Sequence, residues 1–268
     1  MVSFRLSNVS VKVGNKFLLK DIDFDLSGGT FLGILGENGA GKSTLLKVLA
    51  GATAADTGEI SLLGKPLASY AIADLAKTRA VLPQETDIGF PLEAIEVARL
   101  ANNYANISTD LEESILHDCL TLFNVEALAH RAYLSLSGGE KQRVQLARVV
   151  AQLRFHELRN KIPNKSQQQF LLLDEPIAAL DLHQQMRTLR TLKDLAEQGI
   201  GILMVVHDIN LASLYCDQIV ILKNGEVLAN GHPSATLTED TLLSAFNVHL
   251  KTSTHPDIAR PALVPRLV

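Results

Sequence analysis

The sequence predicts an α/β fold: a mainly parallel β-sheet, N-terminal antiparallel β-strands and an inserted helical subdomain. Three observations in the 268 residues support this fold class. Short apolar runs alternate with helical segments in two parts of the chain, as they do in parallel sheets. A glycine-rich stretch follows one apolar run directly. Between the two parts, from about residue 92 to residue 152, helical spacing replaces the β-type pattern.

The N-terminal elements are predicted from alternation and turn residues. Residues 2–13 and 17–26 alternate β-branched or aromatic residues with polar ones, and Gly14-Asn15 separates them as a turn. We therefore expect two paired strands. The wholly apolar run 31–35 is the first strand of the parallel sheet, and residues 42–50 form the helix after the glycine-rich stretch.

The rest of the chain follows the same logic. In the helical part, apolar residues recur on one face of an amphipathic helix, namely Leu111, Ile115, Cys119, Leu120 and Phe123. Strand and helix signals then alternate again, in the segments 170–173, 182–197, 201–206 and 218–222.

The predicted organisation is one domain over residues 1–252, with the helical subdomain at about 92–152. Residues 154–169 are polar and contain Pro163, so we expect a surface excursion there. Residues 253–268 contain three prolines and are expected to form a loosely ordered tail.

Composition excludes several classes of protein. The formal net charge of −4 argues against a protein that grips nucleic acid, so no nucleic-acid partner is expected. The two cysteines, Cys119 and Cys216, are far apart and suggest neither a disulfide framework nor a zinc site, which favours a reduced, cytoplasmic setting. No signal peptide is visible, and no apolar run reaches the roughly 20 residues that span a bilayer. Any membrane role is therefore expected to run through a partner.

The glycine-rich stretch has the pattern of a P-loop between an apolar strand and a helix. Its glycines allow backbone N–H groups to point at phosphate oxygens, and the helix N-terminus adds a favourable partial charge. Lys42 is expected to reach the β- and γ-phosphates of a nucleotide, and Ser43 to offer its hydroxyl to Mg²⁺. The candidate nucleotide-binding residues are Gly36, Glu37, Asn38, Gly39, Ala40, Gly41, Lys42, Ser43 and Thr44. Kinases, GTPases and motor proteins remain open at this point.

Two carboxylates follow the apolar run of residues 170–173. Ligand chemistry in parallel sheets gathers at the carboxyl ends of strands, where these acids would stand. Asp174 is expected to hold Mg²⁺, directly or through water. Glu175, the next residue, is expected to point in a different direction from Asp174 and to polarise an attacking water as a general base.

A second anion-binding helix start is predicted at Leu136-Ser137-Gly138-Gly139-Glu140. Ser137 is a good N-cap for a helix beginning near Gly139, and the two glycines expose backbone N–H groups. This stretch resembles the signature motif of ABC (ATP-binding cassette) ATPases, and the resemblance covers nearly the whole chain. It implies ATP hydrolysis by a homodimer, in which Ser137, Gly138 and Gly139 of one copy complete the ATP site of the second copy.

Further positions match the family one by one. The resemblance implies that Gln84 is the glutamine that senses Mg²⁺ and water, and that Asp181 crosses the dimer interface. His207, at the end of an apolar strand, resembles the histidine that contacts the γ-phosphate. Two departures are present: Val13 stands where many relatives have an aromatic residue that stacks on adenine, and Ile177-Ala178 replace a small hydroxylated residue. The missing hydroxyl would make one hydrogen bond across the dimer interface, and its loss would weaken that contact by about 1 kcal/mol.

A finer resemblance is to the ATPases of importers for haem, ferric siderophores and cobalamin, carried by residues 179–185 and 207–212. Two further features resemble the haem-importer ATPases within this group: the segment 154–169, and the ending His255-Pro256-Asp257 with Pro265-Arg266. This resemblance implies a two-copy membrane permease, contacted near residues 84–104, and indirectly a periplasmic or extracellular substrate-binding protein. The chain would be peripheral, on the cytoplasmic face of the inner membrane. The alternatives are a soluble assembly or repair factor with the same ATP switch, and a P-loop small-molecule kinase.

Overall fold

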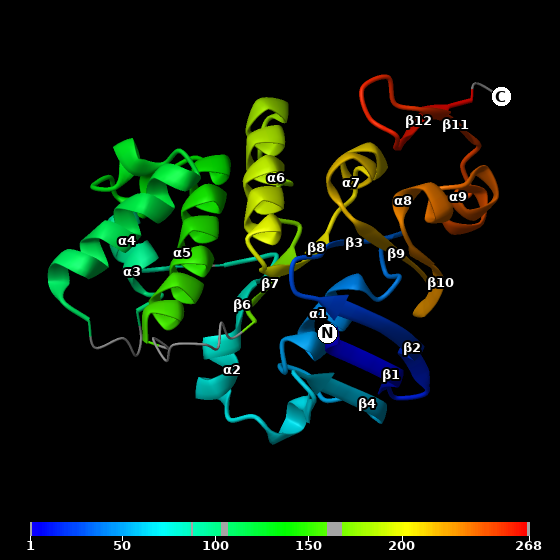
Figure 1. The fold of residues 1–268 in the computed structure, drawn as a ribbon, viewed down its shortest axis with the longest axis horizontal. Helices are drawn as coiled ribbons and strands as arrows, with labels where there is room; N and C mark the ends of the chain where they lie inside the picture. Colours follow the sequence, from blue (N-terminus) through cyan, green and yellow to red (C-terminus); the bar gives the residue numbers. More distant parts are fainter. Residues whose placement is uncertain (1, 87, 103–106, 160–167, 267–268) are drawn as a thin grey trace.

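Among the described residues, three β-sheets and a set of helices make up the structure, which is a computed structural model (Figure 1). The described residues are 2–86, 88–102, 107–159 and 168–266. Figure 1 shows the N-terminal strands on one side of the central sheet and the helices α3, α4 and α5 at the opposite end of the molecule.

The N-terminal sheet is antiparallel and has the strand order β2-β1-β4-β5. Its long hairpin turns between Val13 and Lys16, which are paired across the strands, as the alternation and the turn residues predict. The strands are β1 (Val2–Val13), β2 (Lys16–Ser27), β4 (Thr57–Leu62) and β5 (Lys65–Pro66).

The central sheet has the order β10-β9-β3-β8-β7-β6 among the described residues. Neighbouring strands are parallel except β9 and β10, which form an antiparallel pair at one edge. The mainly parallel sheet predicted from the sequence is therefore confirmed. The strands are β3 (Phe31–Gly36), β6 (Arg79–Leu82), β7 (Phe170–Asp174), β8 (Gly201–Val205), β9 (Gln218–Lys223) and β10 (Glu226–Gly231).

The helices lie between and around the strands. The longer ones are α1 (Lys42–Leu49), α4 (Thr109–Leu122), α5 (Gly138–Arg159), α6 (Leu182–Glu197) and α9 (Glu239–Phe246). The shorter ones are α2 (Ile72–Thr78), α3 (Ala94–Arg99), α7 (Ile209–Tyr215) and α8 (Pro233–Thr236), with 3₁₀ turns at Leu67–Ser69, Glu126–Leu128 and Tyr133–Ser135. On the predicted face of α4, Leu111 is 40% exposed. It lies in the first turn of that helix, before the face meets the core.

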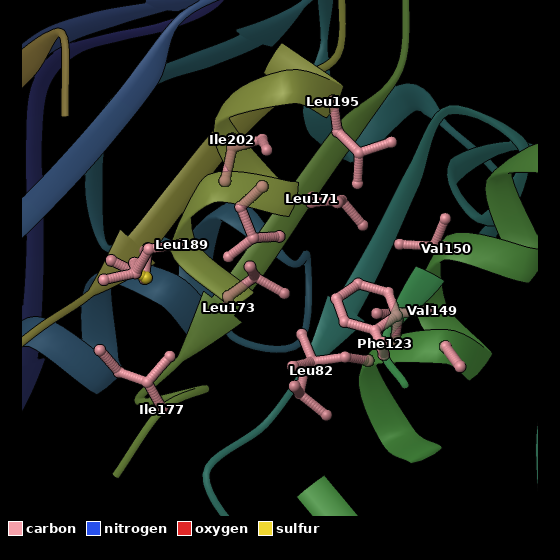
Figure 2. Close-up of a cluster of buried hydrophobic side chains, with 14 of the residues drawn as sticks. Leu82, Phe123, Val149, Val150, Leu171, Leu173, Ile177, Leu189, Leu195 and Ile202 are labelled. Atoms are coloured by element: carbon pink, nitrogen blue, oxygen red, sulfur yellow. The ribbon is translucent and has the colours of Figure 1, made fainter. Parts of the chain in front are cut away.

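The central sheet is buried on both faces, and its strands divide their side chains between two cores. Leu171 and Leu173 point into the core shared with the helices, as Figure 2 shows. Phe170 and Leu172 point to the opposite side, into a core shared with α1 and the N-terminal sheet. The ring of Phe170 meets the ring of Phe4 edge-on, with centroids 4.9 Å apart. Because successive residues face opposite sides of a sheet, burial on both faces requires the continuous apolar run.

Two expectations about the later chain are wrong. Residues 154–159 do not form a surface excursion, because α5 continues through Arg159 and buries Phe155 and His156. The remainder of that segment, 160–167, lies outside the described residues.

The expected loose tail is instead a β-hairpin, in which β11 (Leu250–Thr254) pairs with β12 (Pro261–Pro265). The expected domain boundary at residue 252 falls inside β11. The two prolines stand at the first and last positions of β12, where they interrupt no ladder hydrogen bonds within the strand. Leu263 between them is buried in the core. We call residues 250–265 the C-terminal hairpin.

Candidate nucleotide-binding site

The glycine-rich loop leaves β3 and enters α1 through a backbone that only glycine accepts at two places. Gly36 has a φ of +152°, and a Cβ there would lie 2.4 Å from the carbonyl oxygen of Leu222 on β9. Gly41, the N-cap of α1, has a φ of +106°, and its Cβ would lie 2.7 Å from the carbonyl oxygen of Leu18. Both glycines therefore let the loop fold tightly against neighbouring backbone.

Lys42 is held inside the loop that precedes it. Its Nζ donates hydrogen bonds to the carbonyl oxygens of Gly36, at 2.8 Å, and Glu37, at 2.9 Å. Burial lowers the pKa of Lys42, while the nearby carboxylates of Glu175 and Asp174 oppose that shift. The ammonium group is thus held by two loop carbonyls, and the carboxylates of Glu175 and Asp174 are close enough to raise its pKa. Ser43 and Thr44 follow it, partly buried, in the first turn of α1.

The other loop residues are divided by exposure. Glu37, Asn38 and Gly39 are exposed at the tip of the loop, whereas Ala40 is buried against the core of α1 and the N-terminal sheet. The tip is therefore open to solvent and its base is anchored.

Asp174 stands at the carboxyl end of β7 and is only 4% exposed. Burial raises the pKa of its carboxyl group, and a hydrogen bond from the Ser43 side chain partly offsets this effect. Its Oδ1 atom is buried and has no hydrogen-bond partner in the part of the chain that the structure describes. A buried carboxylate oxygen without a partner, beside a serine hydroxyl, is a donor set that suits a divalent cation such as Mg²⁺.

Glu175 has a backbone φ of +50°, which is unusual for a residue with a side chain. Such a conformation costs on the order of 1 kcal/mol and persists where the surroundings impose it, often at active sites. Oε1 of Glu175 lies 2.6 Å from Nε2 of His207. The two residues meet because β7 and β8 are parallel neighbours, with Asp174 paired to Val205.

The second predicted helix start also has the expected form. Ser137 and Glu140 make a reciprocal cap at the start of α5: Oε2 of Glu140 accepts from both the backbone N–H and the hydroxyl of Ser137, each at 2.8 Å. These hydrogen bonds lower the pKa of Glu140. The helix begins at Gly138, one residue earlier than expected. A Cβ at Gly139 would lie 3.0 Å from the carbonyl oxygen of Ala179, so this helix start packs on the segment after β7.

The predicted residues thus fall into one connected group and three separate positions. Lys42, Ser43, Asp174, Glu175 and His207 interact at the carboxyl edge of the central sheet. The three other positions, Ser137, Asp181 and Gln84, are exposed. Asp181 caps α6 by accepting from the backbone N–H of Gln184 at 2.9 Å, and Gln84 follows β6. Within the described residues, hydrogen bonds and charge interactions connect the members of the first group in a single copy.

Two apolar side chains are exposed next to the turn of the first hairpin. Val13 is 64% exposed and Phe17 is 37% exposed. Nζ of Lys12 lies 4.3 Å from the centre of the Phe17 ring, so a cation already occupies one face of that ring.

Sequence reasoning did not reveal the left-handed backbone of Glu175, the anchoring of Lys42 or the contact between Glu175 and His207. No local pattern marks a positive φ at a glutamate. The adjacency of the two apolar strands was the only available signal for the contact, since strand ends that are neighbours share an edge.

The glycine loop, its lysine and the acidic strand end together define a nucleotide-binding protein of the P-loop type. Residues 19–154 match the family described as ABC transporter. The hemin import ATP-binding protein HmuV of Shewanella denitrificans is 40% identical over 260 residues, which cover 97% of this chain and 99% of that protein. HmuV of Bordetella avium is 41% identical over 265 residues, covering 98% and 99%.

A solved structure of a dimeric ATP-binding cassette, in a post-hydrolysis state with ADP and Pi, superposes with a TM-score of 0.72. It is 26% identical in sequence and covers 85% of this chain and 98% of its own. The chain belongs to the ABC transporter family, and it is an ATP-binding ATPase of that family. In the described residues, no helix is both long and apolar enough to cross a membrane.

Proposed function

We propose that this chain is the ATP-hydrolysing subunit of a haem importer, which acts as a homodimer bound to a separate permease. The observation that carries the hydrolytic part is the group of Lys42, Asp174, Glu175 and His207 at one edge of the sheet. The assignment of haem as the cargo is supported by similarity to two proteins named for hemin import, whose alignments cover 97% and 98% of this chain.

Ser43 and Asp174 would hold Mg²⁺, because the buried Oδ1 of Asp174 has no partner among the described residues and the Ser43 hydroxyl lies beside it. When bound, Mg²⁺ neutralises negative charge that develops on the transferred phosphoryl group. Gln84 is the third proposed ligand of the ion, contributed from the loop after β6.

The roles of the remaining residues follow from charge and position. The Lys42 ammonium, fixed by two loop carbonyls, places a positive charge where backbone N–H groups converge at the start of α1. Glu175 would accept a proton from the attacking water. His207, at hydrogen-bonding distance from Glu175, would keep that carboxylate oriented and contact the terminal phosphate.

A second copy of the chain would complete the site. Ser137 and Gly138 are exposed at the start of α5, and Gly139 is partly buried. In a head-to-tail dimer this start would face the nucleotide of the other copy, with Asp181 beside it. Binding of ATP would then close the dimer, and hydrolysis would open it.

The permease would be contacted through the segment after β6. Phe90 is 72% exposed, whereas Ile88 and Leu92 pack against the core of the helical part. An exposed phenylalanine on a partly anchored loop suits an apolar contact with a membrane partner. Residues 87, 103 and 104 of the expected contact span lie outside the described residues. The chain would accordingly sit on the cytoplasmic face of the inner membrane, with a substrate-binding protein on the other side.

Uptake of labelled haem by source cells tests this proposal. Cells that carry Lys42→Ala should lose haem uptake but keep uptake of a ferric siderophore, and Lys65→Ala, an exposed lysine on β5, should leave both unchanged. Loss of siderophore or cobalamin uptake alone would move the cargo within the same group of importers. If no uptake changed, the importer proposal would be wrong and a soluble ATP-driven factor would replace it.

A further inference from the structure

The C-terminal hairpin packs on α7, the short helix that follows His207 (Figure 1). Asn210, in the first turn of α7, makes two hydrogen bonds with the backbone of Leu263 on β12. Its Nδ2 donates to the carbonyl oxygen at 3.1 Å, and its Oδ1 accepts from the N–H at 2.9 Å. The side-chain amide therefore pairs with the hairpin as a neighbouring strand would.

The other end of α7 is held by the same hairpin. The hydroxyl of Ser213, which is fully buried, donates to the carbonyl oxygen of Pro261 at 2.6 Å. The guanidinium of Arg260 donates to the carbonyl oxygens of Ser213, at 3.1 Å, and Cys216. The positive charge of Arg260 also interacts favourably with the negative end of the helix dipole at the C-terminus of α7. The hairpin thus fastens α7 in both its first and its last turn.

His207 depends on what holds α7. On its N-terminal side the chain is fixed in the sheet, because the N–H of Val206 donates to the carbonyl oxygen of Ile34 at 3.1 Å. On its C-terminal side, Asp208 caps α7 by accepting from the N–H of Leu211 at 3.0 Å. Helices of two turns are marginal without tertiary contacts, so α7 cannot provide a firm support alone.

We propose that the C-terminal hairpin is a clamp that positions His207 against Glu175, and that Asn210 is its main positioning residue. The inference rests on the proposed function, because it assigns His207 a part in hydrolysis. The clamp acts on the hydrolytic step and not on nucleotide binding, since the hairpin contacts the helix after His207 and the phosphate loop is anchored elsewhere.

The test is a double-mutant cycle on ATP hydrolysis by the full chain. Asn210→Ala should lower kcat about tenfold and change KM for ATP less than about twofold, because a small displacement of a reacting group slows chemistry without weakening binding. In a His207→Ala background, whose residual rate is followed with radiolabelled ATP, Asn210→Ala should have no further effect. The matched control is Ser253→Ala, which removes only a hydrogen bond to Ala262 inside the hairpin and should leave kcat unchanged.

An unchanged kcat in Asn210→Ala, or an equal loss with and without His207, would overturn the inference alone. A wild-type chain that hydrolyses no ATP would overturn the proposed function, and the inference with it. If Asn210→Ala fails to fold by circular dichroism, the same cycle is run with Ser213→Ala. That variant loses the single hydrogen bond to Pro261, and the results named for Asn210→Ala support or overturn the inference in the same way.

Discussion

Substitution of Gly36 by alanine tests how the phosphate loop is built. A Cβ at this position would lie 2.4 Å from the carbonyl oxygen of Leu222, and backbone on β9 cannot move aside as a flexible side chain can. The φ of +152° adds strain of about 1–3 kcal/mol for a residue with a side chain. The close contact adds about 1–3 kcal/mol. We therefore expect Gly36→Ala to destabilise the chain by about 2–6 kcal/mol.

Gly39 in the same loop provides the matched control. Its φ is +81°, but a Cβ there would meet nothing within 4 Å. Gly39→Ala should therefore cost only the backbone strain, about 1–2 kcal/mol. At roughly 2–4 °C per kcal/mol, Gly36→Ala should lower Tm by several degrees more than Gly39→Ala. Thermal unfolding measures this difference, and binding of a fluorescent ATP analogue should be lost only in Gly36→Ala. Equal losses of Tm would refute the steric argument.

Three further predictions concern the acidic strand end and the core. Glu175→Gln should slow hydrolysis about 10²–10⁴-fold with nucleotide affinity retained, measured by phosphate release and equilibrium binding. Asp174→Asn should raise Tm of the nucleotide-free chain at pH 7. Because the pKa of Asp174 is raised in the folded chain, its ionisation opposes folding as pH rises above the ordinary pKa of about 4. The gain in Tm should therefore vanish below about pH 4. Leu173→Ala should cost about 2–5 kcal/mol in urea unfolding, whereas Ile72→Ala, at an 85% exposed position, should cost less than about 0.5 kcal/mol.

Local patterns predicted the elements that carry the site. The run Phe170–Leu173 had to be an internal strand, because only burial on both faces explains continuous apolar residues, and both cores confirm it. The phosphate loop followed from glycine spacing between a strand and a helix. These features depend on residues close together in sequence, which is why the sequence alone was sufficient for them.

Features that depend on distant contacts were not predictable in this way. The prolines of the C-terminal segment suggested disorder, yet Leu263 is buried in the core, and the Asn210 side chain hydrogen-bonds with its backbone. In the same way, α5 continues to Arg159 because Phe155 and His156 are buried by other elements, although the local composition there is polar. The contact of Glu175 with His207 joins residues 32 positions apart. Each of these required the packing of the whole chain, which overrides local propensity.

The central claim is that two copies of this chain share each ATP site, and the most direct test is the mass of Glu175→Gln in sedimentation equilibrium with saturating ATP and Mg²⁺. Because hydrolysis would be blocked while Lys42 and the helix start at Ser137 remain intact, we predict a dimer of the 29.1 kDa chain with ATP and a monomer without it. A monomer under both conditions would contradict the shared site.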